Sequence, residues 1–193
     1  MAHFTRINKQ SFSLLFLILA DEPTGNLDTK TSIEAGKDVT VEALADMFLV
    51  HAALSIAASG GQVAAGGTVA IILTESDTIA VIGDNAVVTS TNGAIKVNAY
   101  NKEKMITALA SASASTGSVG AAGTVNVFIS DSTTTANVGN LAKLTAKENI
   151  EITAEGNTWM LVINAALGAS SNTAVGATVT VNVYNRDVNA IVG

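Results

Sequence analysis

The chain has 193 residues, of which 48% are hydrophobic, 4% are aromatic and only 13% are charged. Because charged residues are this scarce and apolar residues are not, the composition disfavours a disordered chain, a coiled coil and a charged solenoid. A formal net charge of −6 provides no basic surface for nucleic acid, and the absence of Cys excludes disulfides, thiolate zinc sites and a Cys nucleophile.

The first predicted element is the apolar stretch Phe12–Ala20, which Arg6 and Lys9 precede. Basic residues followed by a short apolar run are typical of a secretory signal, here with cleavage after Ala20. A buried strand over Phe12–Leu19 is the alternative, and the sequence leaves both interpretations open.

The segment Leu17–Asp28 reads LILADEPTGNLD. It resembles the Walker B strand and D-loop of ABC-transporter ATPases of the lipoprotein-release and macrolide-export type, and the likeness covers residues 14–34. The resemblance implies that Asp21 holds the Mg²⁺ shell of Mg-ATP, that Glu22 is the general base, and that Asp28 contacts a second subunit across the nucleotide. Two adjacent carboxylates at the carboxyl end of a hydrophobic strand agree with such roles.

The phosphate-binding loop that such an ATPase requires is absent from the sequence. The pattern G-x-x-x-x-G-K-[ST] occurs nowhere, and the only Gly-Lys pair, Gly36-Lys37, is followed by Asp38. The run Ser59–Gln62 resembles the family's signature loop, but it follows the Walker B segment, and we interpret it as a polar turn. We therefore expect no catalysis, no cofactor-binding residue and no bound metal. An inactive, truncated ATP-binding subunit stays as the alternative function.

Three copies of one pattern fill residues 36–193. Val39, Ile95 and Ile150 open equivalent runs, 56 and 55 residues apart. Further equivalent positions are Thr68, Thr124 and Thr178, and Gly83, Gly139 and Gly193. A fixed period of this length indicates a repeat architecture. We expect an N-terminal part at 1–35 and repeats at 36–91, 92–146 and 147–193, the last one truncated, with a junction near residues 34–38 that arose by gene rearrangement or a mis-assembled reading frame.

Within a repeat the hydrophobic period is two, as in Thr124–Ile129, which is the pattern of a strand with one buried face. Asn92-Gly93 and Glu155–Asn157 are expected to be turns. Leu44–Leu54 has helical spacing, but its counterparts in the other repeats are less helical, so we expect a strand there as well. The pattern predicts a parallel β-helix whose repeats of about 55 residues each contain two or three coils.

Three stretches, at 47–74, 105–130 and 158–185, contain no Asp, Glu, Lys or Arg. Each is long enough to cross a bilayer. Ser, Thr and Gly interrupt all three, Asn interrupts the second and third, and the alternation has a period of two, which does not fit an embedded helix. Lipid-facing strands usually carry aromatic residues at the membrane interfaces, and this chain has few, so we expect no clear transmembrane segment.

A second resemblance is carried by the runs Gly66–Ile71, Ala122–Val127 and Ala177–Val183. They are similar to repeats of large bacterial surface adhesins of the filamentous-haemagglutinin and leukotoxin-like kind, over residues 36–193. The resemblance implies an all-β, right-handed parallel β-solenoid at the bacterial outer surface, where exposed faces attach to a host cell or matrix. It implies no individual binding residue. The ATPase-like segment would instead imply the cytoplasmic side of the inner membrane.

The remaining candidate features are weak. Glu75, Asp77, Asp84 and Asp131 do not have the spacing of calcium-binding loops. Trp159 is expected to pack in the core or at its rim. Because a solenoid without polar caps leaves strand edges open, we expect edge-to-edge self-association through its ends.

Overall fold

The computed structural model describes residues 2–6, 10–11, 16–19 and 32–193. The described residues form strands and turns and contain no helix. The strands are β1 (Ala2–Arg6), β2 (Gln10–Ser11), β3 (Phe16–Leu19), β4 (Ser32–Ala35), β5 (Val39–Ser59), β6 (Val63–Ile82), β7 (Val87–Ser90), β8 (Ile95–Ser115), β9 (Val119–Val138), β10 (Lys143–Ala146), β11 (Ile150–Ala169) and β12 (Thr173–Val192).

Each coil consists of three strands and begins four or five residues before the corresponding repeat. The first coil consists of β4, β5 and β6, the second of β7, β8 and β9, and the third of β10, β11 and β12. Equivalent strands of successive coils pair in parallel, so that Val39 lies beside Ile95 and Ile95 beside Ile150. The sheets β4-β7-β10 and β6-β9-β12 are built in the same way. The fold is therefore the predicted all-β, right-handed parallel β-solenoid.

The expectation of two or three coils per repeat is wrong, because the long strands are much longer than usual. They have 20 or 21 residues, against about five or six in an ordinary strand. None of them contains Pro, and their period of two continues from one turn to the next. Two long strands and one short strand thus use up a whole repeat.

Two local predictions are confirmed and one is wrong. Leu44–Leu54 lies inside β5 and is a strand, and Asn92-Gly93 belongs to the turn before β8. Glu155–Asn157, by contrast, lies inside β11 and is not a turn. A Cβ at Gly156 would approach Cγ2 of Val188, on the facing strand β12, to 3.1 Å. This Gly therefore makes room between two sheets, a common reason for Gly within a strand.

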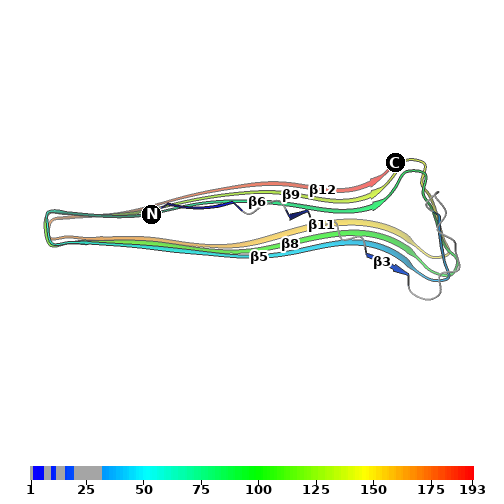
Figure 1. Cartoon of the computed structure of the whole chain (residues 1–193), viewed down its shortest axis with the longest axis horizontal. Helices are drawn as coiled ribbons and strands as arrows, with labels where there is room; N and C mark the ends of the chain where they lie inside the picture. Colours follow the sequence, from blue (N-terminus) through cyan, green and yellow to red (C-terminus); the bar gives the residue numbers. More distant parts are fainter. Residues whose placement is uncertain (1, 7–9, 12–15, 20–31) are drawn as a thin grey trace.

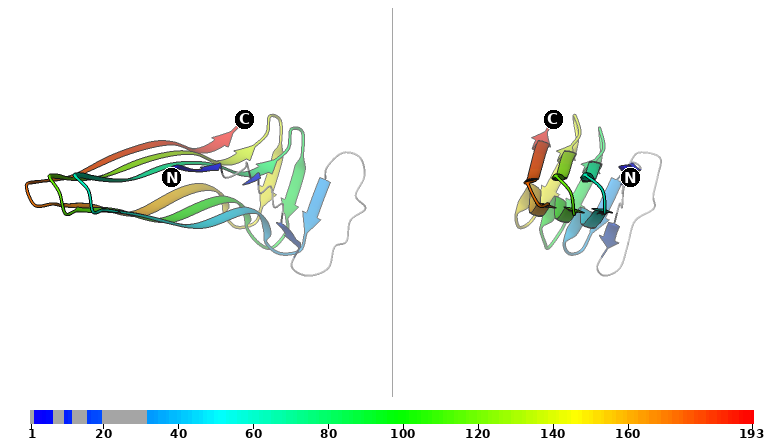
Figure 2. Two further views of the ribbon diagram at one scale, coloured as in Figure 1. Left: turned by 60° about the vertical axis from the view of Figure 1, so that its left-hand side comes forward. Right: turned by 90° about the vertical axis from the view of Figure 1, so that its left-hand side faces the viewer.

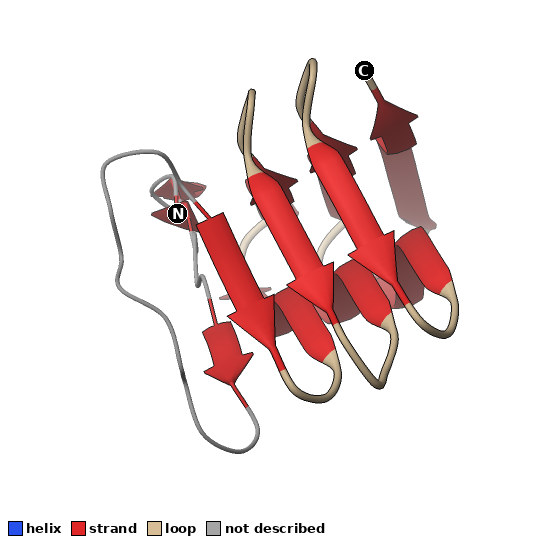
Figure 3. Cartoon of the chain, turned by 90° about the vertical axis from the view of Figure 1, so that its right-hand side faces the viewer, coloured by secondary structure: helices blue, strands red, loops and turns tan. Residues whose placement is uncertain are grey.

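The solenoid is elongated and flattened (Figure 1). The sheet β5-β8-β11 faces the sheet β6-β9-β12, and the two converge toward the turns at 60–62, 116–118 and 170–172 that join them. At the opposite end the short strands β4, β7 and β10 form a third sheet (Figures 2 and 3). We name residues 49–73, 105–129 and 160–183 the narrow half, and the remainder of the three coils the wide half.

The main apolar core lies in the wide half, where all three sheets meet. It consists of stacked Val, Ile and Ala side chains: Ala35, Val39, Val41, Ala43, Ala80, Ile82, Ala86, Val88, Ile95, Val97, Ala99, Ala136 and Val138. A smaller cluster of Ile72, Met105 and Phe128 lies between the long sheets where the narrow half begins. Burial of one Val or Ile side chain contributes about 1.5–3 kcal/mol, so most of the hydrophobic stabilisation comes from the wide half.

The backbones of the two long sheets approach each other closely near the turns of the narrow half. A Cβ at Gly66 would lie 2.7 Å from the carbonyl oxygen of Ala112, and a Cβ at Gly120 would overlap the carbonyl oxygen of Ala169. Packed sheets are normally about 10 Å apart, with interdigitating side chains between them. Here the interior side chains next to the turn of the central coil are Ser111, Ser113, Ser115, Gly120 and Ala122.

The turns that lead into the short strands are alike in successive coils. A backbone hydrogen bond closes Gly83–Ala86 at 3.4 Å and Gly139–Ala142 at 3.3 Å. Asn85 and Leu141 occupy the equivalent third position, and both have a φ of 58°. Asn adopts this left-handed region readily, whereas the larger Leu is strained there.

We expect Gly120→Val to lower the free energy of unfolding by about 1–3 kcal/mol, because the new side chain must push against backbone of the facing sheet. Gly123→Val is the control. It lies on the outer side of the same strand, where a Cβ would be 3.8 Å from the nearest atom, the Ala177 carbonyl oxygen. Urea denaturation measures both, and equal destabilisation by the two substitutions would contradict the close approach of the sheets.

Leu141→Asn should raise the free energy of unfolding by about 1 kcal/mol, because Asn relieves the cost of the left-handed conformation. The reciprocal Asn85→Leu should lower it by a similar amount. Midpoints of urea denaturation report both changes. Destabilisation by Leu141→Asn would show that the turn does not require this backbone conformation.

Candidate functional site

The residues that the ATPase resemblance singles out lie outside the described residues. Asp21, Glu22 and Asp28 all fall within residues 20–31. Of the signal-like stretch Phe12–Ala20, only β3 is described, as a strand antiparallel to the start of β5. The roles implied for these residues stay predictions.

The acidic residues considered as calcium ligands do not form a site. Among the described residues, no three His, Cys, Asp or Glu side chains are grouped so that they could hold a metal ion. Asp84 Oδ1 instead accepts a hydrogen bond from the backbone N–H of Asn140 in the next coil (2.7 Å). Asp38 Oδ1 accepts one from the N–H of Ala94 in the same way (2.8 Å). These carboxylates link successive coils at their turns.

A buried polar cluster lies between the long sheets at the border of the two halves. Glu103 on β8 is only 1% exposed. Its Oε2 accepts a hydrogen bond from Thr158 Oγ1 (3.0 Å), and Asn101 Nδ2 lies 3.5 Å from its Oε1. Asn101 also donates to Ser132 Oγ (2.7 Å) and Ser76 Oγ (3.3 Å) on the facing sheet. The cluster therefore connects all three coils and both long sheets.

Tyr184 on β12 lines a small pocket together with Thr158 of this cluster. Its hydroxyl donates to Met160 Sδ (2.8 Å), and its ring centroid is 5.7 Å from that of Phe128. Partial burial raises the pKa of Tyr184, Arg186 opposes this rise, and Glu103 adds to it. The phenol thus stays protonated at neutral pH and acts as a hydrogen-bond donor.

The interior of the narrow half is lined mainly by small and polar side chains. Buried side-chain atoms for which the described residues offer no hydrogen-bond partner occur in Ser111, Ser113, Thr124 and Asn126. Leaving such a group unsatisfied costs about 1–3 kcal/mol. The space between the sheets in this half is therefore not a conventional hydrophobic core.

Many large apolar side chains of the narrow half point outward, although Met105, Leu109 and Phe128 are buried between the sheets. On the outer side of the sheet β5-β8-β11, five successive rows of three residues are entirely apolar, and we name this surface the β8 face. The rows are Val50, Ile106, Leu161; Ala52, Ala108, Ile163; Leu54, Ala110, Ala165; Ile56, Ala112, Leu167; and Ala58, Ala114, Ala169. Leu54 and Leu167 are each 68% exposed, and Ile56 is 72% exposed.

The opposite sheet has a matching outer surface, which we name the β9 face. Its rows contain one Thr and no charged residue. They are Val63, Val119, Thr173; Ala65, Ala121, Val175; Gly67, Gly123, Ala177; Val69, Val125, Val179; Ile71, Val127, Val181; and Leu73, Ile129, Val183. The next row, Glu75, Asp131 and Asn185, begins the wide half. Both sides of the narrow half are thus apolar.

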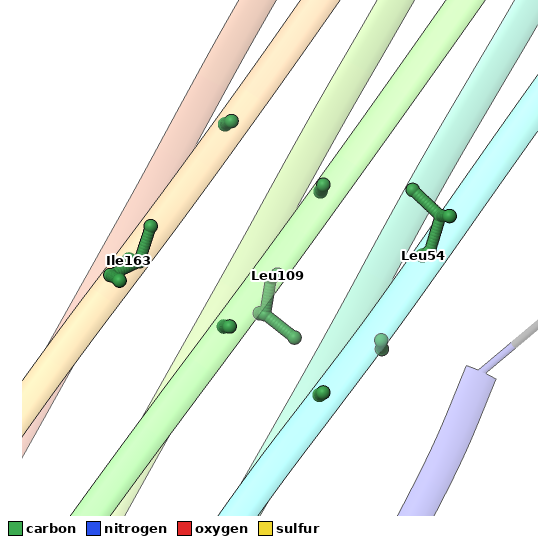
Figure 4. A pocket seen from close by; sticks show the side chains of 8 residues that line it. Leu54, Leu109 and Ile163 are labelled. Atoms are coloured by element: carbon green, nitrogen blue, oxygen red, sulfur yellow. The ribbon is translucent and has the colours of Figure 1, made fainter.

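A groove follows the middle strand of the β8 face. Ala108 and Ala110 of β8 line it together with Leu54 of β5 and Ile163 of β11. Figure 4 places Leu54 and Ile163 on the two flanking strands with β8 between them. Leu109 also borders the groove, although it is only 2% exposed. The larger side chains of the flanking strands form the walls, and the Ala methyl groups form the floor.

Aromatic and basic residues border the β8 face on its wide-half side. Phe48, Lys104 and Trp159 form the row next to the first apolar row, and Tyr100 and Lys102 follow on β8. Phe48 is 64% exposed and Trp159 50%. The expectation that Trp159 packs in the core or at its rim is therefore wrong, because Trp159 lies on the outer surface beside the β8 face.

Sequence reasoning did not identify the two apolar faces. Their signal is present in β8, where Ala108, Ala110 and Ala112 alternate with Leu109 and Ser111. The usual rule that the more apolar side of a strand faces the core would turn the Ala side inward. The structure has the opposite arrangement, with Ser111 inside and Ala110 outside. It depends on the sheet that faces β8, which the sequence of β8 alone does not reveal.

No family model, curated protein or solved structure matches this chain. Within the described part of the chain, no helix is long and apolar enough to span a membrane.

Asn101→Ala should lower the free energy of unfolding by about 1–3 kcal/mol, because Glu103 and Ser132 lose a buried hydrogen-bond partner. Asn157→Ala, at an exposed position on the neighbouring strand, should change it little. Thermal and urea unfolding measure both. An equally small effect of Asn101→Ala would show that the cluster does not hold the coils together.

Proposed function

We propose that the chain is a non-catalytic, structural and adhesive repeat segment of a bacterial cell-surface or secreted adhesin. The observation that carries this proposal is the repetition of the same outer surfaces, in register, over three coils. Val50, Ile106 and Leu161, for example, present one kind of side chain three times at neighbouring positions. A surface that offers one contact repeatedly suits attachment, because several weak contacts act together.

The placement of the adhesin-like runs supports the proposal. Gly66–Ile71, Ala122–Val127 and Ala177–Val183 lie on β6, β9 and β12, at equivalent positions of one sheet. The resemblance thus follows one sheet of the solenoid rather than isolated loops. In this proposal the chain acts at the bacterial outer surface, and its partner is a host-cell or matrix surface.

Further copies of the chain are the second proposed partner. In the described residues, β5 pairs with β3 over Val39–Glu42 only, so most of its outer edge carries unpaired backbone groups. β11 and β12 form the opposite edges of the two long sheets. Long open edges of this kind favour pairing with another chain.

The alternative function, an inactive fragment of an ABC-transporter ATP-binding subunit, is supported by the segment Leu17–Asp28 alone. It places the chain at the cytoplasmic side of the inner membrane and gives it affinity for Mg-ATP.

Two measurements separate the functions. The adhesive proposal predicts saturable binding of the fluorescently labelled chain to host cells or to matrix-coated surfaces, and no shift of the unfolding temperature with Mg-ATP. Stabilisation by Mg-ATP that Asp21→Asn abolishes, and that the control Asp46→Asn, at an exposed position, retains, would favour the ATPase fragment. Absence of binding to every cell and matrix surface would refute the adhesive function.

A further inference from the structure

We propose that the narrow half of the solenoid inserts into the hydrocarbon layer of a lipid membrane. The turns at 60–62, 116–118 and 170–172 enter the membrane first. This inference deepens the proposed function, on which it rests, by naming the lipid layer as the surface to which the chain attaches. It is carried by three features of the described residues: an inverted distribution of apolar side chains, the length of the apolar band, and the residues that border it.

The inverted distribution points to a surrounding apolar medium rather than to a protein partner. A protein docked on one sheet would cover the β8 face or the β9 face but not both. In the narrow half, both faces are apolar, and the turns at 60–62, 116–118 and 170–172 contain no charged residue. The polar side chains of the same region, such as Ser111 and Asn126, face inward. Lipid chains contact both faces at once, and they exclude charged groups.

The charged residues of the long strands all lie on one side of a single boundary. On the outer surfaces they begin with Asp46, Lys104, Glu75 and Asp131. The uncharged stretches 47–74, 105–130 and 158–185 extend from this boundary through the turn and back again. The charge pattern and the apolar faces therefore mark the same part of the molecule.

The length of the apolar band fits a bilayer. Residues 49–59 of β5 run from the boundary to the turn, which at roughly 3.3 Å per residue corresponds to about 36 Å. The hydrocarbon core of a bilayer is about 30 Å thick. The narrow half can thus be immersed while the charged wide half stays in water.

On the β8 face, the boundary has the composition of a membrane interface. Phe48, Tyr100 and Trp159 lie on the outer side of the sheet within a few residues of the first apolar row, and Lys102 and Lys104 lie among them. Trp and Tyr are enriched at the level of the lipid headgroups, where Lys side chains also extend into water. Three of the eight aromatic residues of the chain therefore lie where lipid-facing strands carry them. The groove between Leu54 and Ile163, floored by Ala, has the shape to accept an acyl chain.

The unpaired edges of the long sheets impose a condition on insertion of the narrow half into a membrane. Unpaired backbone N–H and C=O groups are not tolerated in hydrocarbon. The outer edges of β5, β11 and β12 must therefore be paired by further coils or copies when the narrow half is immersed. Lipid docking and edge-to-edge association are thus coupled, and membrane partitioning should rise more steeply than linearly with protein concentration.

Flotation of the full chain with phosphatidylcholine vesicles tests the inference. These vesicles carry no net charge, so that binding reports apolar contact and should persist in high salt. The chain is expected to float with the vesicles. The emission of Trp159, the only Trp, should shift to shorter wavelength as it enters the headgroup region.

Paired variants on the outer surface provide the decisive comparison. Ile163→Asp and Leu54→Asp place a charge on the β8 face and should reduce partitioning more than about tenfold, because a carboxylate in hydrocarbon is costly. Asn157→Asp places the same charge on β11 in the wide half and should leave partitioning unchanged. All three positions are exposed, and far-UV circular dichroism confirms that each variant keeps its β structure.

Four results would overturn the inference: no flotation of the wild type, loss of flotation in high salt, partitioning that rises only in proportion to protein concentration, or equal losses in Ile163→Asp and Asn157→Asp.

Sedimentation of the same variants tests the rival explanation, in which a second copy of the chain and not lipid covers the β8 face. If Ile163→Asp converts a dimer to a monomer and the wild type ignores vesicles, a second copy covers the face. Binding of the same preparations to matrix-coated surfaces distinguishes failure of lipid docking from failure of the adhesive function itself.

Discussion

Parallel backbone pairing between equivalent strands of successive coils is the constraint on which the structure depends. It continues without a slip along strands of 20 or 21 residues. Because side chains alternate with a period of two, a shift by one residue would exchange the inner and outer surfaces of a whole strand. Differences in repeat length are taken up outside the strands: four residues connect β7 to β8, and three connect β10 to β11. The carboxylates of Asp38 and Asp84 bond to the backbone of the next coil and so fix the same register at the turns.

The wide half and the narrow half differ in which side chains fill the space between the long sheets. In the wide half the third sheet holds the long sheets apart, and Val, Ile and Ala fill the space as an ordinary core. Toward the turns no such spacer is present in the described chain, and backbone atoms of the facing sheets come close enough to exclude a Cβ at Gly120. Next to the turns only small side chains fit inside, and large apolar side chains such as Leu54, Ile56 and Leu167 occupy outer positions. The apolar faces are thus a consequence of thin packing, and a surface of this kind is the basis of both the adhesive proposal and the lipid inference.

The solenoid fold could be predicted from the sequence because two of its signals are local: the period of two within the strands and the spacing of Val39, Ile95 and Ile150. The number of coils could not, because Gly within a strand looks like a turn signal. Gly156 lies within a strand, where the absence of a side chain makes room for the facing sheet. Nothing in its immediate sequence distinguishes it from Gly93, which does lie in a turn. The orientation of β8 could not be predicted either. Whether Ala110 or Ser111 faces inward depends on the approach of a sheet that begins only after the following turn.

Cysteine scanning of residues 106–113 tests the inverted packing most directly, and the absence of native Cys makes each substitution the only thiol in the chain. Reaction of folded single-Cys variants with a water-soluble thiol reagent should be fast at 106, 108, 110 and 112 and slow at 107, 109, 111 and 113. Inverted packing produces this alternation, with the Ala positions reactive and the Ser positions protected. Fast reaction at Ser111 and Ser113 with protection at Ala110 and Ala112, or no alternation at all, would contradict it.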